Sequence, residues 1–175
     1  DGINYNPAAA TKATRVLNAP GKDLVYVAGS FNNWQPSLAH AMKKDMATGK
    51  FWLELTGLTA GQIETYQYWV VDQTPAANTQ AMVKTADPFS TLVLSPTDDS
   101  YLTPAQYPDM PVYPAGQSFD VTVLQTAQVP YNWQVTDFVK PAKEDLIIYE
   151  TLVRDFNSEK TWTSLAAQID YFKNL

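Results

Sequence analysis

Aromatic side chains are the residues of this sequence whose type best suits a defined recognition chemistry. The chain of 175 residues holds five tryptophans and ten tyrosines. Flat aromatic faces either fill a β core or stack on the apolar C–H faces of sugar rings. Trp34 ends a loop, Gly29 to Trp34 (GSFNNW), whose glycine and two asparagines tolerate tight or left-handed turns. A tryptophan at such a corner is more often a core residue than a ligand platform, so the pattern alone leaves both interpretations open.

Polar side chains give weaker candidates. His40, the sole histidine, lies in a polar segment between predicted strands, where a solvated side chain is the usual outcome. Asp98 and Asp99 could bind Ca²⁺, but two adjacent carboxylates without further oxygen ligands usually form a turn. The sequence has no phosphate-binding glycine loop, no Ser/His/Asp set and no metal-ligand spacing. We therefore expect no metal and no cofactor in these residues.

Composition narrows the class of partner. The net charge is −6 and the largest basic cluster is Lys43-Lys44, which disfavours nucleic acid. Cysteine is absent, so the chain has no disulfide framework, and the compartment stays open. No apolar run approaches the roughly 20 residues that span a bilayer. The start, Asp1 to Asn4, lacks the basic and apolar character of a signal sequence, so we expect that any export signal was removed or never existed.

Short strands separated by turn signals dominate the first part of the chain. Alternation is clearest at 51–55, where Phe51, Leu53 and Leu55 face one way and Trp52 and Glu54 the other. After an extended or disordered lead-in over 1–12, the pattern over 13–125 predicts a mainly β, antiparallel sandwich with no helix before residue 163. A connector with prolines is expected over 126–145. We predict six strands, at 14–17, 24–28, 51–55, 65–72, 91–94 and 119–124.

The last thirty residues, 146–175, follow another pattern. Leu146 to Tyr149 is an apolar strand, and a helix is predicted over 163–173 with Leu165, Ile169 and Phe172 on one face. One β/α unit cannot bury its own strand without several more such units, so we expect the start of a second, incomplete domain. Its strand should pair with an exposed sheet edge, swap into a second molecule to form a dimer, or be ordered only through lattice contacts.

The sandwich motifs in combination resemble a known family. GSFNNW after a strand, the aromatic strand from Tyr66 to Asp72 and the segment ADPFS at 86–90 resemble, over roughly residues 13 to 95, the N-terminal immunoglobulin-like (early-set) domain of α-amylase-type enzymes. The related family 48 carbohydrate-binding modules share this sandwich. In glycan-binding members, the tryptophan at the position of Trp34 stacks on a glucose ring. Tyr68 or Trp69, depending on the alignment, stands where those members have a lysine, and the glycine and second tryptophan that follow in them are absent here.

The segment from Asp145 to Phe156 (DLIIYETLVRDF), followed by Trp162 and the predicted helix, resembles the first strand and helix of a glycoside hydrolase family 13 (β/α)₈ barrel. That family commonly has histidine at the position of Leu152. Retaining hydrolysis needs two carboxyl groups about 5–5.5 Å apart, and in this family the catalytic carboxylates follow later strands that this sequence lacks. Glu150 and Asp155 could be taken for a catalytic pair; we expect instead that Glu150 makes structural hydrogen bonds and that Arg154 and Asp155 pair locally.

The resemblance implies a function for the parent protein and a smaller one for this chain. It implies the non-catalytic N-terminal domain of an α-amylase-family enzyme acting on starch, glycogen or maltooligosaccharides, with a structural role against its own catalytic barrel and contact with α-glucan through Trp34, Tyr68 and Trp69. The alternative is a dedicated starch- or glycogen-binding module. A glycan-sensing regulatory subunit is disfavoured, since residues 146–175 would have no role in one. The family further implies an extracytoplasmic bacterial enzyme, with calcium, if any, held by residues outside this sequence.

Overall fold

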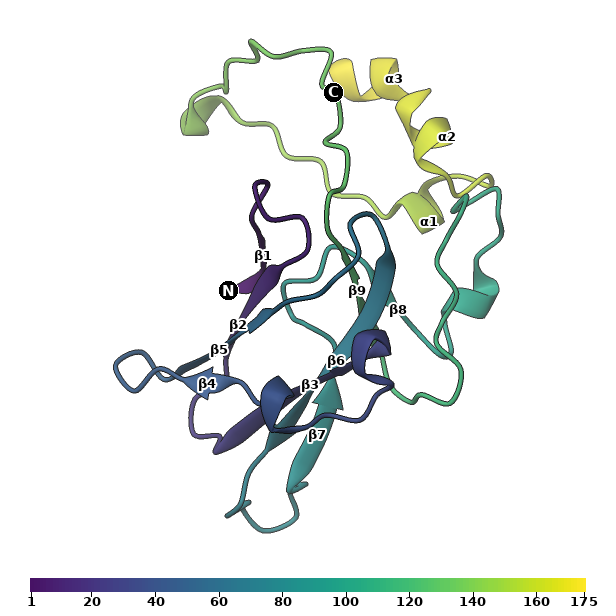
Figure 1. The fold of residues 1–175 in the computed structure, drawn as a ribbon. Helices are drawn as coiled ribbons and strands as arrows, with labels where there is room; N and C mark the ends of the chain where they lie inside the picture. The colour runs from purple at the N-terminus through teal and green to yellow at the C-terminus, as the bar shows by residue number, and fades with distance from the viewer. The chain divides into compact units, whose positions relative to one another are not determined.

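The computed structural model describes all 175 residues and divides into two compact units. The first unit comprises Asp1–Tyr101 and Pro111–Val129, and the second comprises Leu102–Met110 and Pro130–Leu175. All strands lie in the first unit and form two antiparallel sheets, which confirms the prediction of a mainly β, sandwich-like fold (Figure 1). The strands are β1 (Gly2–Tyr5), β2 (Ala13–Asn18), β3 (Leu24–Gly29), β4 (Lys43–Lys44), β5 (Lys50–Leu55), β6 (Ile63–Val71), β7 (Met82–Thr85), β8 (Val93–Leu94) and β9 (Val121–Gln125).

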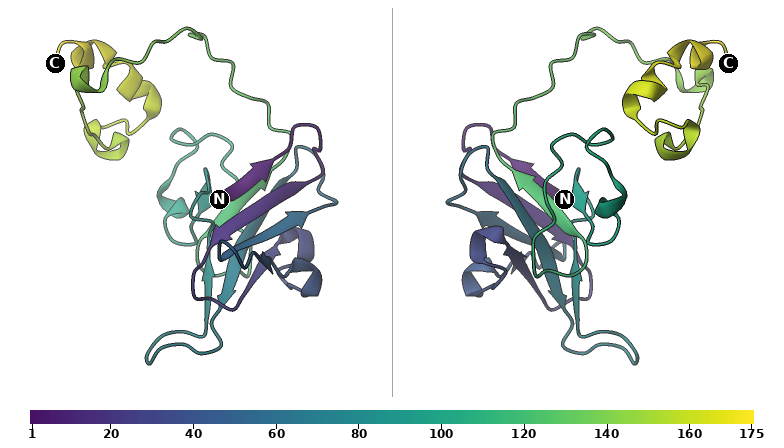
Figure 2. Two further views of the ribbon diagram at one scale, coloured as in Figure 1. Left: turned by 90° about the vertical axis from the view of Figure 1, so that its left-hand side faces the viewer. Right: turned by 90° about the vertical axis from the view of Figure 1, so that its right-hand side faces the viewer.

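The two sheets pack face to face, as the side views show (Figure 2). One sheet has the order β1-β2-β5-β4, and the other has the order β3-β6-β9-β8 with β7 also paired to β6. β6 is the longest strand, and it pairs with β9 along its first half and with β7 along its second half. β6 therefore organises the second sheet, and its outward side chains lie on a surface shared with three neighbouring strands.

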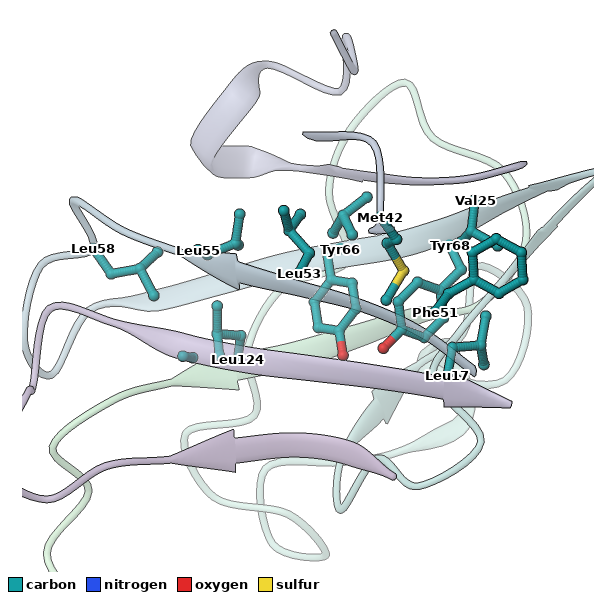
Figure 3. Packing of buried hydrophobic residues seen from close by; sticks show 12 residues of the cluster. Leu17, Val25, Met42, Phe51, Leu53, Leu55, Leu58, Tyr66, Tyr68 and Leu124 are labelled. Carbon is teal, nitrogen blue, oxygen red and sulfur yellow. The ribbon is translucent and has the colours of Figure 1, made fainter. Parts of the chain in front are cut away.

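The core lies between the sheets because side chains alternate along each strand. On β5, Phe51, Leu53 and Leu55 are buried while Trp52 and Glu54 are exposed, as the alternation predicts. The opposing sheet contributes two tyrosines, two valines and a leucine (Figure 3). The buried cluster consists of Ala13, Leu17, Val25, Val27, Met42, Phe51, Leu53, Leu55, Leu58, Tyr66, Tyr68 and Leu124.

A buried polar network crosses this core. The hydroxyls of Tyr66 and Tyr68 each donate a hydrogen bond of 2.8 Å to Oδ2 of Asp87. The guanidinium of Arg15, on the opposite sheet, lies 4.5 Å from the centroid of the Tyr66 ring and is completely buried. Burial lowers the pKa of Arg15 and raises the pKa of Tyr66 and Tyr68 far above the ordinary value. The two hydroxyls thus share one carboxylate as acceptor, while two nitrogens of the Arg15 guanidinium stay without a hydrogen-bond partner and the group faces the Tyr66 ring.

The predicted strands at 14–17, 24–28, 51–55, 65–72, 91–94 and 119–124 correspond to β2, β3, β5, β6, β8 and β9, with ends shifted by up to two residues. The pattern missed three strands. β1 lies in the expected lead-in and pairs with β2, and it has only four residues. β4 has two residues, and β7 has four, with Lys84 between Val83 and Thr85. Each missed strand lies at a sheet edge, where burial on one face is too small to impose a pattern on the sequence.

The second unit is helical and extended, with no barrel-type β/α unit. Residues 146–149 form no strand, so the prediction of a strand there is wrong. An extended segment becomes a strand only when a neighbour pairs with its backbone groups, and none does so here. The single helix predicted over 163–173 is divided in two by Ala167 and Gln168. The helices are α1 (Val153–Phe156), α2 (Trp162–Ala166) and α3 (Ile169–Lys173).

The helical unit has a small aromatic cluster but no buried residue. Tyr149 lies 5.1 Å from Phe172 between ring centroids, and Phe156 lies 5.4 Å from the same ring. Thr161 caps α2 by accepting a hydrogen bond of 3.1 Å from the backbone nitrogen of Ser164. None of the helices is long and apolar enough to cross a lipid bilayer.

Candidate functional site

The outward face of β6 carries the side chains that are the best candidates for a binding site. Tyr66, Tyr68 and Val70 point into the core, so Gln67 and Trp69 point outward. Trp69 is directly opposite Tyr26 on β3 and Lys84 on β7. Antiparallel partners share a face, so Tyr26, Trp69 and Lys84 form one row across three strands.

A pocket of about 260 Å³ opens beside this row. One wall is the end of β7 and the residues after it, and the other wall belongs to the segment that precedes β9. Lys84 and Asp120 bring opposite charges to the pocket, while Phe119 brings an aromatic ring that is 59% exposed. The lining is completed by Thr85 and Ala86.

The segment from Tyr113 to Asp120, which we call the strap, is fastened to β6 by Gln67. The side-chain nitrogen of Gln67 donates to the carbonyl oxygens of Ser118 at 2.7 Å and of Asp120 at 3.0 Å, and more weakly to that of Phe119 at 3.3 Å. Tyr113 donates its hydroxyl to the carbonyl of Phe119 at 2.7 Å. Gln67 is completely buried under the strap, and its Oε1 has no hydrogen-bond partner.

Trp69 has the second unpartnered polar atom of this face. Its Nε1 is buried without an acceptor, and its ring lies 4.2 Å from the ammonium of Lys84. A donor without an acceptor, on Trp69, and an acceptor without a donor, on Gln67, therefore lie two residues apart on β6. Each of these two residues contacts a residue that lines the pocket. Buried polar atoms without partners cost about 1–3 kcal/mol each, so a hydrogen-bond partner for either atom would be stabilising.

Trp34 is held by an unusual backbone. Asn33 and Trp34 both have left-handed φ angles, of 53° and 58°. The side chain of Asn32 fixes the loop by accepting from the Gly29 backbone nitrogen at 2.9 Å and donating to the Val27 carbonyl at 3.0 Å. A left-handed tryptophan costs about 1–3 kcal/mol, and such strain concentrates at functional positions. The Trp34 side chain remains partly exposed.

Glycine at position 29 is required by close packing. A Cβ placed there would lie 2.5 Å from the carbonyl oxygen of Thr65 and 2.6 Å from the ring of Phe31. Ser30 strengthens the same junction through hydrogen bonds with the Glu64 carboxylate and, at 3.0 Å, the Thr65 backbone nitrogen. The GSFNNW loop is therefore locked to β6 at its beginning and turned sharply at its end.

Of the three residues that the resemblance implied, the structure leaves two partly exposed and buries one. Trp69 lies on the outward face of β6, and Trp34 is partly exposed on its loop. Tyr68 is fully buried in the core, with its hydroxyl bonded to Asp87, and offers no ring surface to a ligand. The reason is the pleat of β6, which sends neighbouring residues to opposite faces.

The remaining polar candidates do not converge. His40 accepts or donates one hydrogen bond of 3.1 Å with Ser37, and its ring tilts against Phe31. Asp98 lies in an exposed turn, and no group of three His, Asp or Glu side chains comes together to hold a metal ion.

Asp155 pairs with Arg154 through two hydrogen bonds of 3.0 and 3.1 Å, which confirms the expected local pair. This contact lowers the pKa of the Asp155 carboxyl. Glu150 is exposed and makes no hydrogen bond, so the expectation of structural hydrogen bonds for it is wrong. It lies in the segment that lacks a partner strand, and no neighbour is placed to donate to it.

Sequence reasoning missed Lys84, Phe119 and Asp120. Lys84 belongs to an unpredicted strand, while Phe119 and Asp120 were assigned to the predicted strand at 119–124. Phe119 instead has a left-handed φ of 65° and ends the strap before β9 begins at Val121. The Ser-Phe-Asp turn chemistry before a run of β-branched residues was the available signal.

Known proteins give a partial likeness. No family model matches the chain, and no curated protein matches it. Among solved structures, the apo pullulanase from Paenibacillus barengoltzii is 21% identical over 54% of this chain and 13% of that one, with a TM-score of 0.38. PulA from Klebsiella pneumoniae is 19% identical over 54% of this chain and 8% of that one, with a TM-score of 0.41. The likeness covers about half of this chain and a small part of each larger protein, at low identity.

Proposed function

We propose that the sandwich is a non-catalytic, immunoglobulin-like domain of an α-amylase-family enzyme that acts on α-glucans, and that it contacts glucan at the pocket between β7 and the strap. The unpartnered Gln67 Oε1 and Trp69 Nε1 carry the proposal. Both residues contact the pocket lining, Gln67 through the carbonyls of Phe119 and Asp120 and Trp69 through Lys84, and Lys84 and Asp120 bring a donor and an acceptor to the pocket itself, as polyhydroxylated ligands need. The choice of α-glucan as the ligand rests on the resemblance of the GSFNNW and YETLVRDF motifs to that family.

Access to the Trp69 ring depends on Lys84. The ammonium lies over the indole face, where a sugar ring would stack. A cation–π contact at an exposed site is worth about 0.5–1 kcal/mol, and the lysine stem has four rotatable bonds. Moving Lys84 aside therefore costs little and leaves its ammonium free to donate to a ligand hydroxyl.

A purely structural domain is the second candidate. It is favoured by the strap, whose three hydrogen bonds to Gln67 cover part of the outward face of β6. Under this alternative, the domain packs on its catalytic partner and the pocket has no ligand.

Affinity electrophoresis in gels containing soluble starch separates the two candidates. Glucan contact predicts that the 175-residue chain is retarded, and that Asp120→Ala and Trp69→Ala each reduce the retardation while thermal unfolding stays cooperative. Asp98→Ala, an exposed carboxylate outside the pocket, is the matched control and should migrate as the unmutated chain does. Equal mobility with and without starch would support the structural domain alone.

The same chain should release no reducing ends from starch. The two carboxylates on the α-helices of residues 146–175 are already paired, Asp155 with Arg154 and Asp170 with Lys173. Hydrolysis above the level of a mock preparation would overturn the non-catalytic assignment.

A further inference from the structure

The outer face of the other sheet carries a second aromatic surface, unrelated to the pocket. Phe51, Leu53 and Leu55 of β5 are buried, so Trp52 points outward and is 37% exposed. It is directly opposite Val16 on β2 and Lys43 on β4. Val16, Trp52 and Lys43 form a row across three strands, about 10 Å long at the ordinary strand spacing. We call this row the Trp52 strip.

Polar side chains border the strip on both sides. Thr14 and Glu54 are cross-strand partners two residues away in one direction, and Asn18 and Lys50 are partners two residues away in the other. Residues two apart on a strand share a face, so all four lie beside the strip. A flat apolar row with hydrogen-bonding groups along both edges matches a sugar, which has an apolar ring face and hydroxyls at its rim.

The charges around the strip suit a neutral ligand. Glu54 pairs with Lys12 at 3.2 Å, and Lys50 pairs with Asp1 at 2.8 Å. Lys43 has no carboxylate partner; its ammonium lies 4.7 Å from the centroid of the Trp52 ring. The two charged borders are thus neutralised within the protein, while one ammonium is left to donate to an uncharged oxygen.

The size of the strip argues against a protein partner. A stable protein interface buries about 800 Å² on each side and is usually centred on several buried anchors. One partly exposed tryptophan and one valine fall far short of that area. A glucan chain needs only a stacking surface and hydrogen bonds at its edges.

We infer that the Trp52 strip is a second glucan-contact surface, on the sheet opposite the pocket, so that one domain contacts two glucan segments. The identity of the sugar rests on the proposed function, whereas the position of the site rests on the strip itself. Two weak sites on opposite faces would bind a polymeric glucan more tightly than a short oligosaccharide, because the second contact becomes intramolecular.

The indole NH signals of the five tryptophans test this inference in ¹H–¹⁵N spectra of the whole chain titrated with maltoheptaose. Trp52→Phe and Trp69→Phe assign the two relevant signals. The strip predicts a saturating shift of the Trp52 signal. Trp133 and Trp162 are 71% and 74% exposed and serve as internal controls, whose signals should stay in place.

Each pattern of shifts decides a different claim. A shift at Trp69 without one at Trp52 overturns the strip and leaves the proposed function standing. A shift at Trp52 alone supports the strip and contradicts the pocket. No shift at either signal, or equal shifts at Trp133 and Trp162, overturns the strip. In the supporting case, Trp52→Ala should weaken binding to insoluble starch on the order of tenfold, with cooperative unfolding retained.

Discussion

Asp87 is the residue on which the buried polar groups of the sandwich depend. Its Oδ2 accepts from both tyrosine hydroxyls, and its Oδ1 accepts from the Phe89 backbone nitrogen at 2.9 Å. Asp87→Ala should lower the free energy of unfolding by about 3 kcal/mol, because two buried hydroxyls and the Phe89 backbone nitrogen lose their acceptor. Urea unfolding followed by fluorescence measures the change.

Asp98→Ala is the control for this substitution, since that side chain lies in an exposed turn. Surface changes of this kind usually fall within about 0.5 kcal/mol. If Asp87→Ala proves as mild as its control, the carboxylate does not hold the core together.

Tyr66 and Tyr68 make the sandwich sensitive to alkali. Burial raises the pKa of both phenols above the ordinary value, and the Asp87 charge adds to the effect. In the unfolded chain they ionise near pH 10, so above that pH the folded state binds more protons than the unfolded state. Their contribution is therefore complete below about pH 10 and is lost as the pH rises further.

The urea midpoint should accordingly stay level from pH 7 to 9 and fall above pH 10. Tyrosinate absorbance from these two residues should appear only with unfolding. Titration of all ten tyrosines while circular dichroism still reports the native fold would contradict the buried network.

The strap is an element that the sequence did not predict and that the structure shows bonded to Gln67 of β6. Gln67→Met removes the donor that binds three strap carbonyls, at similar side-chain volume. Limited chymotrypsin digestion should then cleave after Phe119 several times faster, because local opening of the strap becomes easier. Gln62→Met is the control, as Gln62 bonds to Glu64 away from the strap. Unchanged cleavage would show that Gln67 does not fasten it.

At the scale of elements, the sequence predicts the strands that bury one face, because their side chains alternate. It does not predict the strands that form mainly because their backbone pairs with a neighbour. Phe51, Leu53 and Leu55 predicted β5 because one face of that strand is buried. Lys84 gave no such signal, since β7 owes its conformation to its pairing with β6. Tyr68 illustrates the same limit at the site, because its burial depends on the strand register and a shift of one residue reverses both faces.

The helical unit shows how far the structure of the whole chain can be predicted from the periodicity of its sequence. Its apolar residues predicted a strand and one continuous helix, yet Ile147 and Ile148 stay more than 80% exposed and no neighbour pairs with them. Periodicity reports what a segment could bury, while the conformation that forms depends on a partner surface.

This difference between the units predicts two levels of protection from hydrogen exchange. The helical unit has no buried residue, so amides in α2 and α3 should exchange close to the rate of an unfolded peptide. Amides of β2, β5 and β6 should be protected by several orders of magnitude, because they open only with the sandwich. Mass spectrometry of peptic fragments measures both, and equal protection of α3 and β6 would contradict the division.

Calorimetric titration with maltoheptaose tests the proposed glucan contact most directly. The unmutated chain should bind with a Kd of about 1 mM or tighter, and Trp69→Ala should weaken binding about tenfold. Trp133→Ala, which removes an exposed tryptophan of the helical unit, should leave the affinity unchanged. Absence of binding by the unmutated, folded chain, or equal affinity for the unmutated chain and Trp69→Ala, would contradict a glucan site on the outward face of β6.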